Sequence, residues 1–129
     1  MNQIIVKKLG FLCLLVVFAA SCSSDSLPEP AESNCGTLMP TYTTDIKDII
    51  DQSCAFSGCH LDSAPGQYDT YAGLLSILEN NKFRTRVILE RADGLVGMPP
   101  DFTPEGRPKD LTNEQIELID CWLQAGFPE

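Results

Sequence analysis

The stretch Cys54-Ala-Phe-Ser-Gly-Cys59-His60 places two thiols and the only histidine of the 129-residue chain within one short segment. Four residues separate the two cysteines, and the histidine follows the second cysteine directly. Side chains of this kind bind metal ions, pair as a disulfide or anchor a prosthetic group. Which of these three uses applies therefore decides whether the rest of the chain folds around a metal ion, a disulfide or a prosthetic group.

The first 21 residues have the pattern of an export signal. Lys7 and Lys8 form a charged start, and the apolar run Leu9–Ala20 is about half the ~20 residues that a membrane-spanning helix needs. The small residues Ala19-Ala20-Ser21 lead into Cys22 and resemble a bacterial lipobox, in which the signal is cut before the cysteine and the thiol receives lipid. We expect a lipid-anchored protein of the bacterial cell envelope that faces the periplasm. An ordinary signal peptide with a chance cysteine near the cut is the alternative.

The chain then divides into three parts. We expect a signal peptide at 1–21, lipid attachment and a disordered tether at 22–41, and one folded domain at 42–129. Residues 23–34 are rich in Ser, Pro and Glu, and such a composition cannot bury enough apolar surface to fold. The folded part is long enough for one domain with a small core.

Two cysteines followed at once by a histidine form the residue set of covalent haem attachment. Each thiol adds across one haem vinyl group, and the imidazole becomes an axial ligand of the iron. The usual motif has two residues between the cysteines, so here the extra residues must bulge outward. Ser57-Gly58 suit a bulge because glycine tolerates unusual φ angles. Two alternatives stay open: a zinc site that adds Cys35 or Cys121 to the three motif residues, and a disulfide-stapled domain without haem.

The remaining cysteines depend on the same choice. Cys13 leaves with the signal and Cys22 would carry lipid, so four thiols stay in an oxidising compartment, where free thiols are rare. Three pairings are possible if all four form disulfides. If Cys54 and Cys59 hold haem, only Cys35 and Cys121 are left to pair. That bridge would close a long loop and stabilise the fold by roughly 4–5 kcal/mol in the chain-entropy model.

Apolar residues recur at helical spacing, and no useful stretch alternates as a β-strand does. We expect a helix over 45–53 with Thr44 as N-cap, and a second over 70–80 that is entered through Asp69. Residues 83–91 fit neither period. The domain should therefore be nearly all α.

The last helix has the clearest boundaries. Thr112 and Gln115 form a capping box, and Gly126 stands where a helix commonly ends. One half of its circumference is apolar: Ile116, Leu118, Ile119, Trp122, Leu123 and Ala125. The opposite side carries Glu117, Asp120 and Gln124, and Cys121 lies at the border. The apolar faces are wide for so few helices, which indicates that something else fills the middle of the domain.

A haem would fill that space, and its iron needs a second axial ligand from later in the chain. His60 is the only histidine, which excludes ligation by two histidines of one chain. The methionines beyond the signal are Met39 and Met98. Met98 precedes two prolines, which restrict the loop backbone, and follows Gly97, which permits a close backbone approach. The alternative is that Met98 only fills a gap in the core.

Together these elements resemble a small class I c-type cytochrome domain over residues 42–127, closest to the short cytochrome-c-like lipoproteins of Gram-negative envelopes. The resemblance rests on Cys54, Cys59, His60, Met98-Pro99-Pro100, Leu111-Thr112 and Cys121-Trp122-Leu123. It implies an all-α, cytochrome c-like fold with short helices around one covalently bound haem c. It also implies that the N-terminal and C-terminal helices cross, with Ile46, Ile49 and Ile50 against Ile116, Ile119 and Leu123. Cys54 and Cys59 would form the thioether bonds, and His60 and Met98 would be the axial ligands.

The function that this resemblance implies is the transfer of single electrons. We expect no enzyme activity, because no Ser/His pair, second histidine or paired carboxylates suggest a catalytic site. His/Met ligation raises the reduction potential of a haem. A haem-based ligand-binding or sensing module, with a displaceable Met98, is the alternative. Arg84, Arg86, Arg91 and Trp122 are candidates for contact with the haem propionates, or else surface charges and a core aromatic.

The mature chain would carry 18 acidic residues and 7 of the 9 basic ones, a net charge of −11. This balance excludes nucleic acid as a partner, because phosphate binding needs clustered basic charge. It also leaves the lipid on Cys22 as the means of holding the membrane. An acidic surface would steer a redox partner protein with a basic docking face. Solubility alone would explain it equally well.

Overall fold

The computed structural model describes residues 31–129. The predicted signal peptide at 1–21 and the lipidation site at Cys22 lie outside the described residues. Over the described range the chain is all α, with helices and loops and without a β-strand. No helix in this range has the length and apolar character that crossing a membrane requires.

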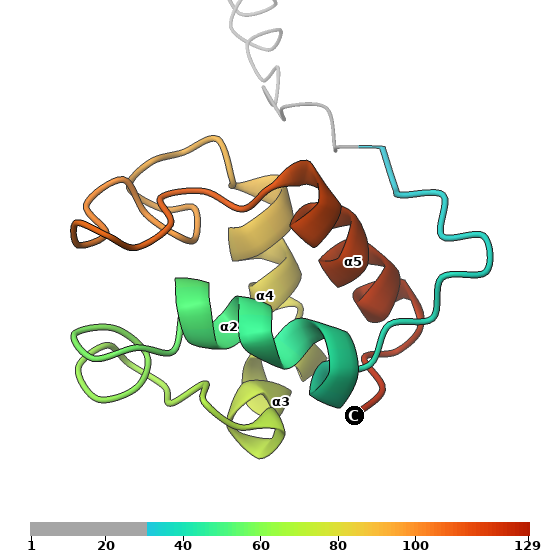
Figure 1. Ribbon diagram of the computed structural model, residues 1–129, viewed down its shortest axis with the longest axis horizontal. Helices are drawn as coiled ribbons and strands as arrows, with labels where there is room; N and C mark the ends of the chain where they lie inside the picture. Colours follow the sequence, from blue (N-terminus) through green and yellow to red (C-terminus); the bar gives the residue numbers. More distant parts are fainter. Residues whose placement is uncertain (1–30) are drawn as a thin grey trace, which may run out of the picture.

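Helices alternate with two long loops (Figure 1). In chain order the elements are the π-helical turn η1 (Tyr42–Ile46), α2 (Lys47–Ser53), α3 (Tyr71–Glu79), α4 (Lys82–Arg84), the π-helical turn η2 (Thr85–Leu89) and α5 (Asn113–Gln124). The turn η1 runs directly into α2, and α4 runs directly into η2. The ambiguous residues 83–91 are therefore helical as far as Leu89. The loops 54–70 and 90–112 extend from the same side of the helices in Figure 1.

The predicted capping of the last helix is confirmed. The side chain of Thr112 accepts a hydrogen bond from the Gln115 amide at 3.2 Å, and the Gln115 side chain accepts one from the Thr112 amide at 2.9 Å. Gly126 follows the helix with a φ of +81°, which glycine adopts without steric cost. These signals lie close together in sequence, so the sequence alone predicts this helix well.

The predicted start of the first helix was wrong by three residues, and that of the second by one. Thr41, not Thr44, caps the first helix, and its hydroxyl accepts from the Thr44 amide at 3.3 Å. The helix begins early because Tyr42 is buried in the core. Thr70, not Asp69, caps α3 by accepting from the amide of Gly73. Runs of Thr and Asp offer several possible caps, and burial of the following turn selects one.

A single apolar core joins the first and last helices. The turn η1 contacts α5, and the rings of Tyr42 and Trp122 lie 6.3 Å apart. Ile46, Ile49, Ile50 and Ile119 belong to this buried cluster, and Ile116 and Leu123 pack against it. The residues expected to meet across the two helices thus share one core.

The segment after α5 ties several elements together through backbone carbonyls. The Pro128 carbonyl accepts hydrogen bonds from the Tyr42 amide at 2.9 Å and from the Trp122 indole at 2.8 Å. The Tyr71 hydroxyl donates to the Phe127 carbonyl at 2.9 Å. The turn η1 and the helices α3 and α5 therefore meet at this short segment.

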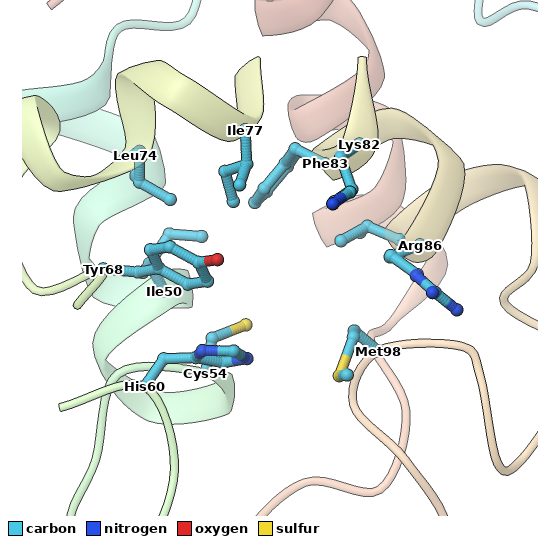
Figure 2. Close-up of a pocket in the computed structure, with 11 residues that line it drawn as sticks. Ile50, Cys54, His60, Tyr68, Leu74, Ile77, Lys82, Phe83, Arg86 and Met98 are labelled. Atoms are coloured by element: carbon cyan, nitrogen blue, oxygen red, sulfur yellow. The ribbon is translucent and has the colours of Figure 1, made fainter. Parts of the chain in front are cut away.

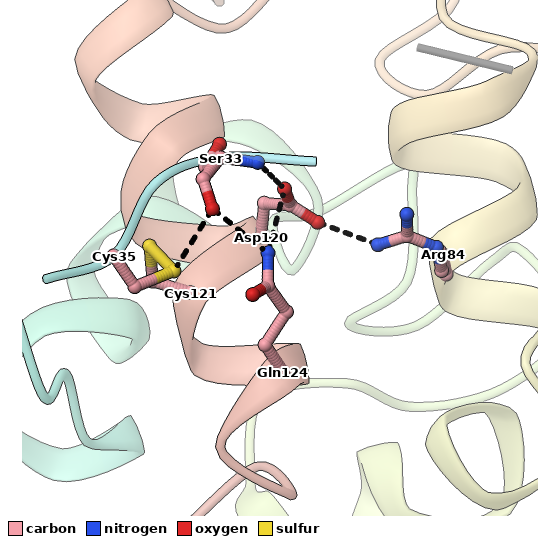
Figure 3. Close-up of a disulfide and its surroundings, with 6 residues drawn as sticks. All are labelled: Ser33, Cys35, Arg84, Asp120, Cys121 and Gln124. Carbon is pink, nitrogen blue, oxygen red and sulfur yellow. Dashed lines mark hydrogen bonds and ion pairs between the residues drawn. A yellow bond between two sulfur atoms is a disulfide. The ribbon is translucent and has the colours of Figure 1, made fainter. Parts of the chain in front are cut away.

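The segment 31–41 is fastened to α5 (Figure 3). Cys35 forms a disulfide with Cys121, the pairing that the haem interpretation left for these two residues. The Ser33 amide donates to the Asp120 carboxylate at 2.8 Å, and the Gln124 side chain donates to the Ser33 carbonyl at 3.3 Å. Residues 33–41 therefore belong to the folded body and not to the predicted tether.

Asp120 does not lie on a solvent-facing side of α5, as its polarity suggested, because it is only 3% exposed. Arg84 on α4 pairs with its carboxylate, and the Gln124 side chain also donates to it. Burial by itself raises the pKa of Asp120, but the hydrogen bonds from the Ser33 amide and from Arg84 outweigh burial and lower it. This carboxylate is thus an internal junction between α5, α4 and the segment 31–41.

Candidate functional site

A cavity of about 140 Å³ lies between the two long loops and the helices (Figure 2). This is roughly ten times the space that one water molecule needs. Apolar side chains from α2, α3, α4 and η2 form most of its wall, with a few polar groups. It is lined by Ile50, Cys54, His60, Tyr68, Leu74, Ile77, Lys82, Phe83, Arg86, Val87 and Met98.

His60 enters this cavity from the loop after α2 with one ring nitrogen already engaged. Its Nδ1 lies 3.0 Å from the carbonyl oxygen of Pro65 and 3.3 Å from that of Gly66. A carbonyl oxygen can only accept, so Nδ1 carries the proton and Nε2 keeps a free lone pair. The ring also stacks on Tyr68 at 4.3 Å between centroids. His60 is therefore oriented and in the tautomer that a metal ligand requires.

Met98 lies on the other side of the cavity (Figure 2). Its amide donates to the Arg86 carbonyl at 3.0 Å, which docks the loop on η2. Gly97 makes this approach possible, since a Cβ there would lie 2.5–2.9 Å from three backbone carbonyl groups of the preceding turn. Met39, in contrast, is 82% exposed and does not line the cavity. Met98 thus lines the same cavity as His60, whereas Met39 lies outside it.

The two cysteines of the motif are free thiols at different places relative to the cavity. Cys54 lines it, and its sulfur points into the opening in Figure 2. Burial raises the pKa of the Cys54 thiol to about 12, and the nearby Cys59 thiol adds to this effect. Cys59 is partly buried but does not line the cavity. The structure therefore brings Cys54, His60 and Met98 together and leaves Cys59 beside them.

The four residues between the cysteines do not simply bulge outward. Ala55 and Phe56 are buried, whereas Ser57 and Gly58 are exposed and Gly58 has a φ of +89°. The carboxylate of Asp62 accepts hydrogen bonds from the Ser57 hydroxyl and the Gly58 amide, each at 2.8 Å. Only the Ser57-Gly58 half is the predicted bulge. The other half turns inward because Phe56 finds an apolar site, which local sequence does not reveal.

The charged lining differs from the sequence expectation. Arg86 lines the cavity, where its side chain also donates to the Glu90 carboxylate and the Val96 carbonyl. Lys82 lines it as well and was missed, because a lysine at a helix start gives no sign of facing a cavity. Lys82 makes no side-chain hydrogen bond or ion pair within residues 31–129. Two cationic groups thus lie at the edge of an apolar space.

The other proposed propionate contacts are engaged elsewhere. Arg84 pairs with Asp120, and Arg91 donates to the Asp110 carboxylate and to the Leu111 carbonyl. Trp122 is fully buried and donates to a backbone carbonyl. None of the three is among the residues that line the cavity.

Tyr68 is a second lining residue that the sequence did not suggest. It stacks on His60, and its amide donates to the His60 carbonyl at 2.9 Å. Burial raises the pKa of its phenol, with a further contribution from Cys54. An aromatic residue eight positions after a histidine has no distinctive spacing, so only the fold reveals this contact.

The disulfide of Cys35 with Cys121 also bears on the zinc alternative. That alternative needs one of these two thiols as a fourth ligand beside the motif residues, and both are bonded to each other.

Comparison of the chain with protein-family models, with curated proteins and with solved structures found no match.

Proposed function

We propose that this chain is a monohaem c-type cytochrome that carries single electrons in the bacterial cell envelope. The observation that supports the proposal most is the placement of His60 and Met98 on opposite sides of one apolar cavity. The imidazole has its Nδ1 proton held by a backbone carbonyl and its Nε2 free, and the thioether lies across the opening. This donor set is the one that cytochromes c use for axial ligation.

The residues present fit a covalently held haem. Cys54 and Cys59 would provide the two thioether bonds, and His60 and Met98 the axial nitrogen and sulfur. When bound, the haem supplies an iron that alternates between the ferric and ferrous states. Lys82 and Arg86 would face its acidic propionate groups, because a carboxylate beside an apolar cavity needs a cationic partner.

The same residues favour an electron carrier over an enzyme. With His60 and Met98 as the two ligands from the chain, the iron would have no place for a substrate. Thioether ligation would raise the potential, and the apolar side chains of α3 and η2 that line the cavity would act in the same direction. The predicted export signal and lipid at Cys22 would hold the protein to the envelope, and its acidic surface suits a redox partner with a basic face.

Production of the full chain with a c-type maturation system tests the proposal. We expect denatured protein to keep its haem absorbance and to gain the mass of one haem. Cys54→Ala with Cys59→Ala should abolish both signals, whereas Cys35→Ser with Cys121→Ser, the matched control, should retain them. Colourless protein with two internal disulfides would instead support the alternative of a stapled lipoprotein without haem.

A haem-based sensor is distinguished by the strength of the bond from Met98. A firm ligand keeps the reduced protein from binding carbon monoxide at neutral pH, as a carrier requires. Rapid carbon monoxide binding by the unaltered protein would favour the ligand-binding alternative.

A further inference from the structure

The inward half of the Cys54–Cys59 segment meets the loop that carries Met98. Phe56 is 5% exposed, and the Arg107 guanidinium lies over its ring with the central carbon 4.4 Å from the centroid. Arg107 also donates to the Gln52 carbonyl at the end of α2, at 3.4 Å. A cation within about 6 Å of an aromatic face is attracted to it. The inward half of the segment between the cysteines thus gives Arg107 an aromatic ring to cover.

This contact has a special place among the links between the two sides of the cavity. Among the hydrogen bonds, ion pairs and ring contacts of residues 31–129, those of Arg107 alone join the loop 91–110 to the segment 47–70. The segment 47–70 carries His60, and the loop 91–110 carries Met98. Apart from apolar packing, the contacts of Arg107 are therefore what sets the distance between the side chains of His60 and Met98.

The chain between Met98 and Arg107 contains two hydrogen-bonded turns. Thr103 donates its amide and its hydroxyl to the Pro100 carbonyl, at 3.0 and 2.6 Å. The Arg107 amide donates to the Pro104 carbonyl at 3.2 Å. Two successive turns thus connect the methionine to the arginine.

We propose that Phe56 and Arg107 are positioning residues that hold the Met98 loop at ligation distance from His60. The inference rests on the proposed function and deepens it. On this account the segment between the cysteines also serves the distal ligand, since Phe56 anchors the opposite loop. Neither residue touches the reacting atoms.

The test compares three variants of the haem-loaded protein. Loss of the cation in Arg107→Ala should raise the fraction of protein with Met98 dissociated, and with it the apparent affinity of the reduced form for carbon monoxide, by about two- to fivefold. Phe56→Leu keeps apolar volume, removes the aromatic face and should act in the same direction. The double variant should have no larger effect than Arg107→Ala, because Arg107→Ala already removes the contact with the ring. Lys109→Ala removes an exposed cation two residues further along and should change nothing.

A second measurement does not depend on haem. Amide hydrogen exchange of the full chain should be about two- to fivefold faster at Met98, whose amide donates to Arg86, in Arg107→Ala than in Lys109→Ala. Equal exchange in these two variants would overturn the positioning role, as would additive effects of Phe56→Leu and Arg107→Ala on carbon monoxide binding. Protein that carries no haem would overturn the proposed function, and the exchange measurement would still decide the role of the contact.

Discussion

At the scale of single residues, the candidate site depends on which atoms are already committed. His60 donates a hydrogen bond from Nδ1 to the Pro65 carbonyl, and its ring stacks on that of Tyr68. The lone pair of Nε2 remains available, and the contacts with Pro65 and Tyr68 fix the direction in which it points. Two features hold Met98 in place. Its amide donates a hydrogen bond to the Arg86 carbonyl, and Gly97 has no side chain to keep the loop away from the preceding turn.

Removal of the thioether at Met98 should convert the proposed carrier into a ligand-binding protein. Met98→Ala leaves an open axial position, so the reduced protein should bind carbon monoxide on the order of tenfold more tightly or better. Its reduction potential should fall, because methionine favours the ferrous state. Spectroscopic titration and potentiometry measure the two effects. Met39→Ala, at an 82% exposed residue, should alter neither, and an equal response of both variants would argue against ligation by Met98.

A methyl group at position 97 should push the Met98 loop away from the turn that follows η2. In Gly97→Ala the new Cβ would meet backbone carbonyl groups at 2.5–2.9 Å, and backbone cannot move aside as a flexible side chain does. We expect the free energy of unfolding to fall by about 1–3 kcal/mol, together with easier carbon monoxide binding. Denaturant titration measures the first effect. A Gly97→Ala protein with unaltered stability would mean that Gly97 does not pack against this turn so closely.

At the scale of elements, the sequence predicts what local signals determine and misses what distant segments determine. The capping box of Thr112 and Gln115 was predictable because both partners lie within one turn. Asp120 was placed on the wrong side of α5 because its burial comes from Arg84 and from Ser33, far away in sequence. Phe56 is the same case, since Arg107 covers it. That His60 and Met98 would share one site was predictable from the scarcity of histidine and methionine, while the lining by Lys82 and Tyr68 needed the fold.

The junction at Asp120 should make stability depend on acid pH. Its pKa is lower in the folded protein than the ordinary 3.8, so its contribution is complete above that value and is lost as the pH falls through the lower, folded-state value. Asp120→Asn should lower the free energy of unfolding by about 2–4 kcal/mol near neutral pH. The difference from the unaltered protein should shrink below about pH 4.

Urea titrations at several pH values follow this difference. Glu117→Gln on the exposed side of the same helix is the matched control and should show little change. A constant deficit of Asp120→Asn across the acid range would show that the ion pair with Arg84 does not set the pH dependence.

At the scale of the whole molecule, the attachment of the N-terminal segment and the candidate site lie on different sides. In Figure 1 the segment 31–41 runs beside α5, while the loops 54–70 and 90–112 project from the opposite side of the helices. A chain anchored at Cys22 would therefore turn these loops away from its point of attachment. If the chain is the lipid-anchored carrier proposed above, this arrangement would leave the loops free to meet a partner.

The disulfide should matter for stability and not for haem. It closes a loop across 86 positions of sequence, so Cys35→Ser with Cys121→Ser should lower the free energy of unfolding by about 4 kcal/mol in the chain-entropy model. The absorbance of the haem-loaded protein should stay unchanged, because neither cysteine lines the cavity. Denaturant titration and absorbance measure these two effects. An altered haem spectrum would mean that the segment 31–41 influences the site.

The carbonyl groups of Phe127 and Pro128 also bear on when the fold can close as the chain emerges. They accept hydrogen bonds from Tyr42, Tyr71 and Trp122, so the earliest helix is completed by some of the latest residues. A chain that emerges with its N-terminus first, from a ribosome or through a translocation channel, cannot close this fold until residue 128 is free. Until then the thiols at 54 and 59 lie on a chain that lacks these hydrogen bonds. If haem is attached to the two thiols as proposed, this interval would leave them open to modification before the first and last helices are joined.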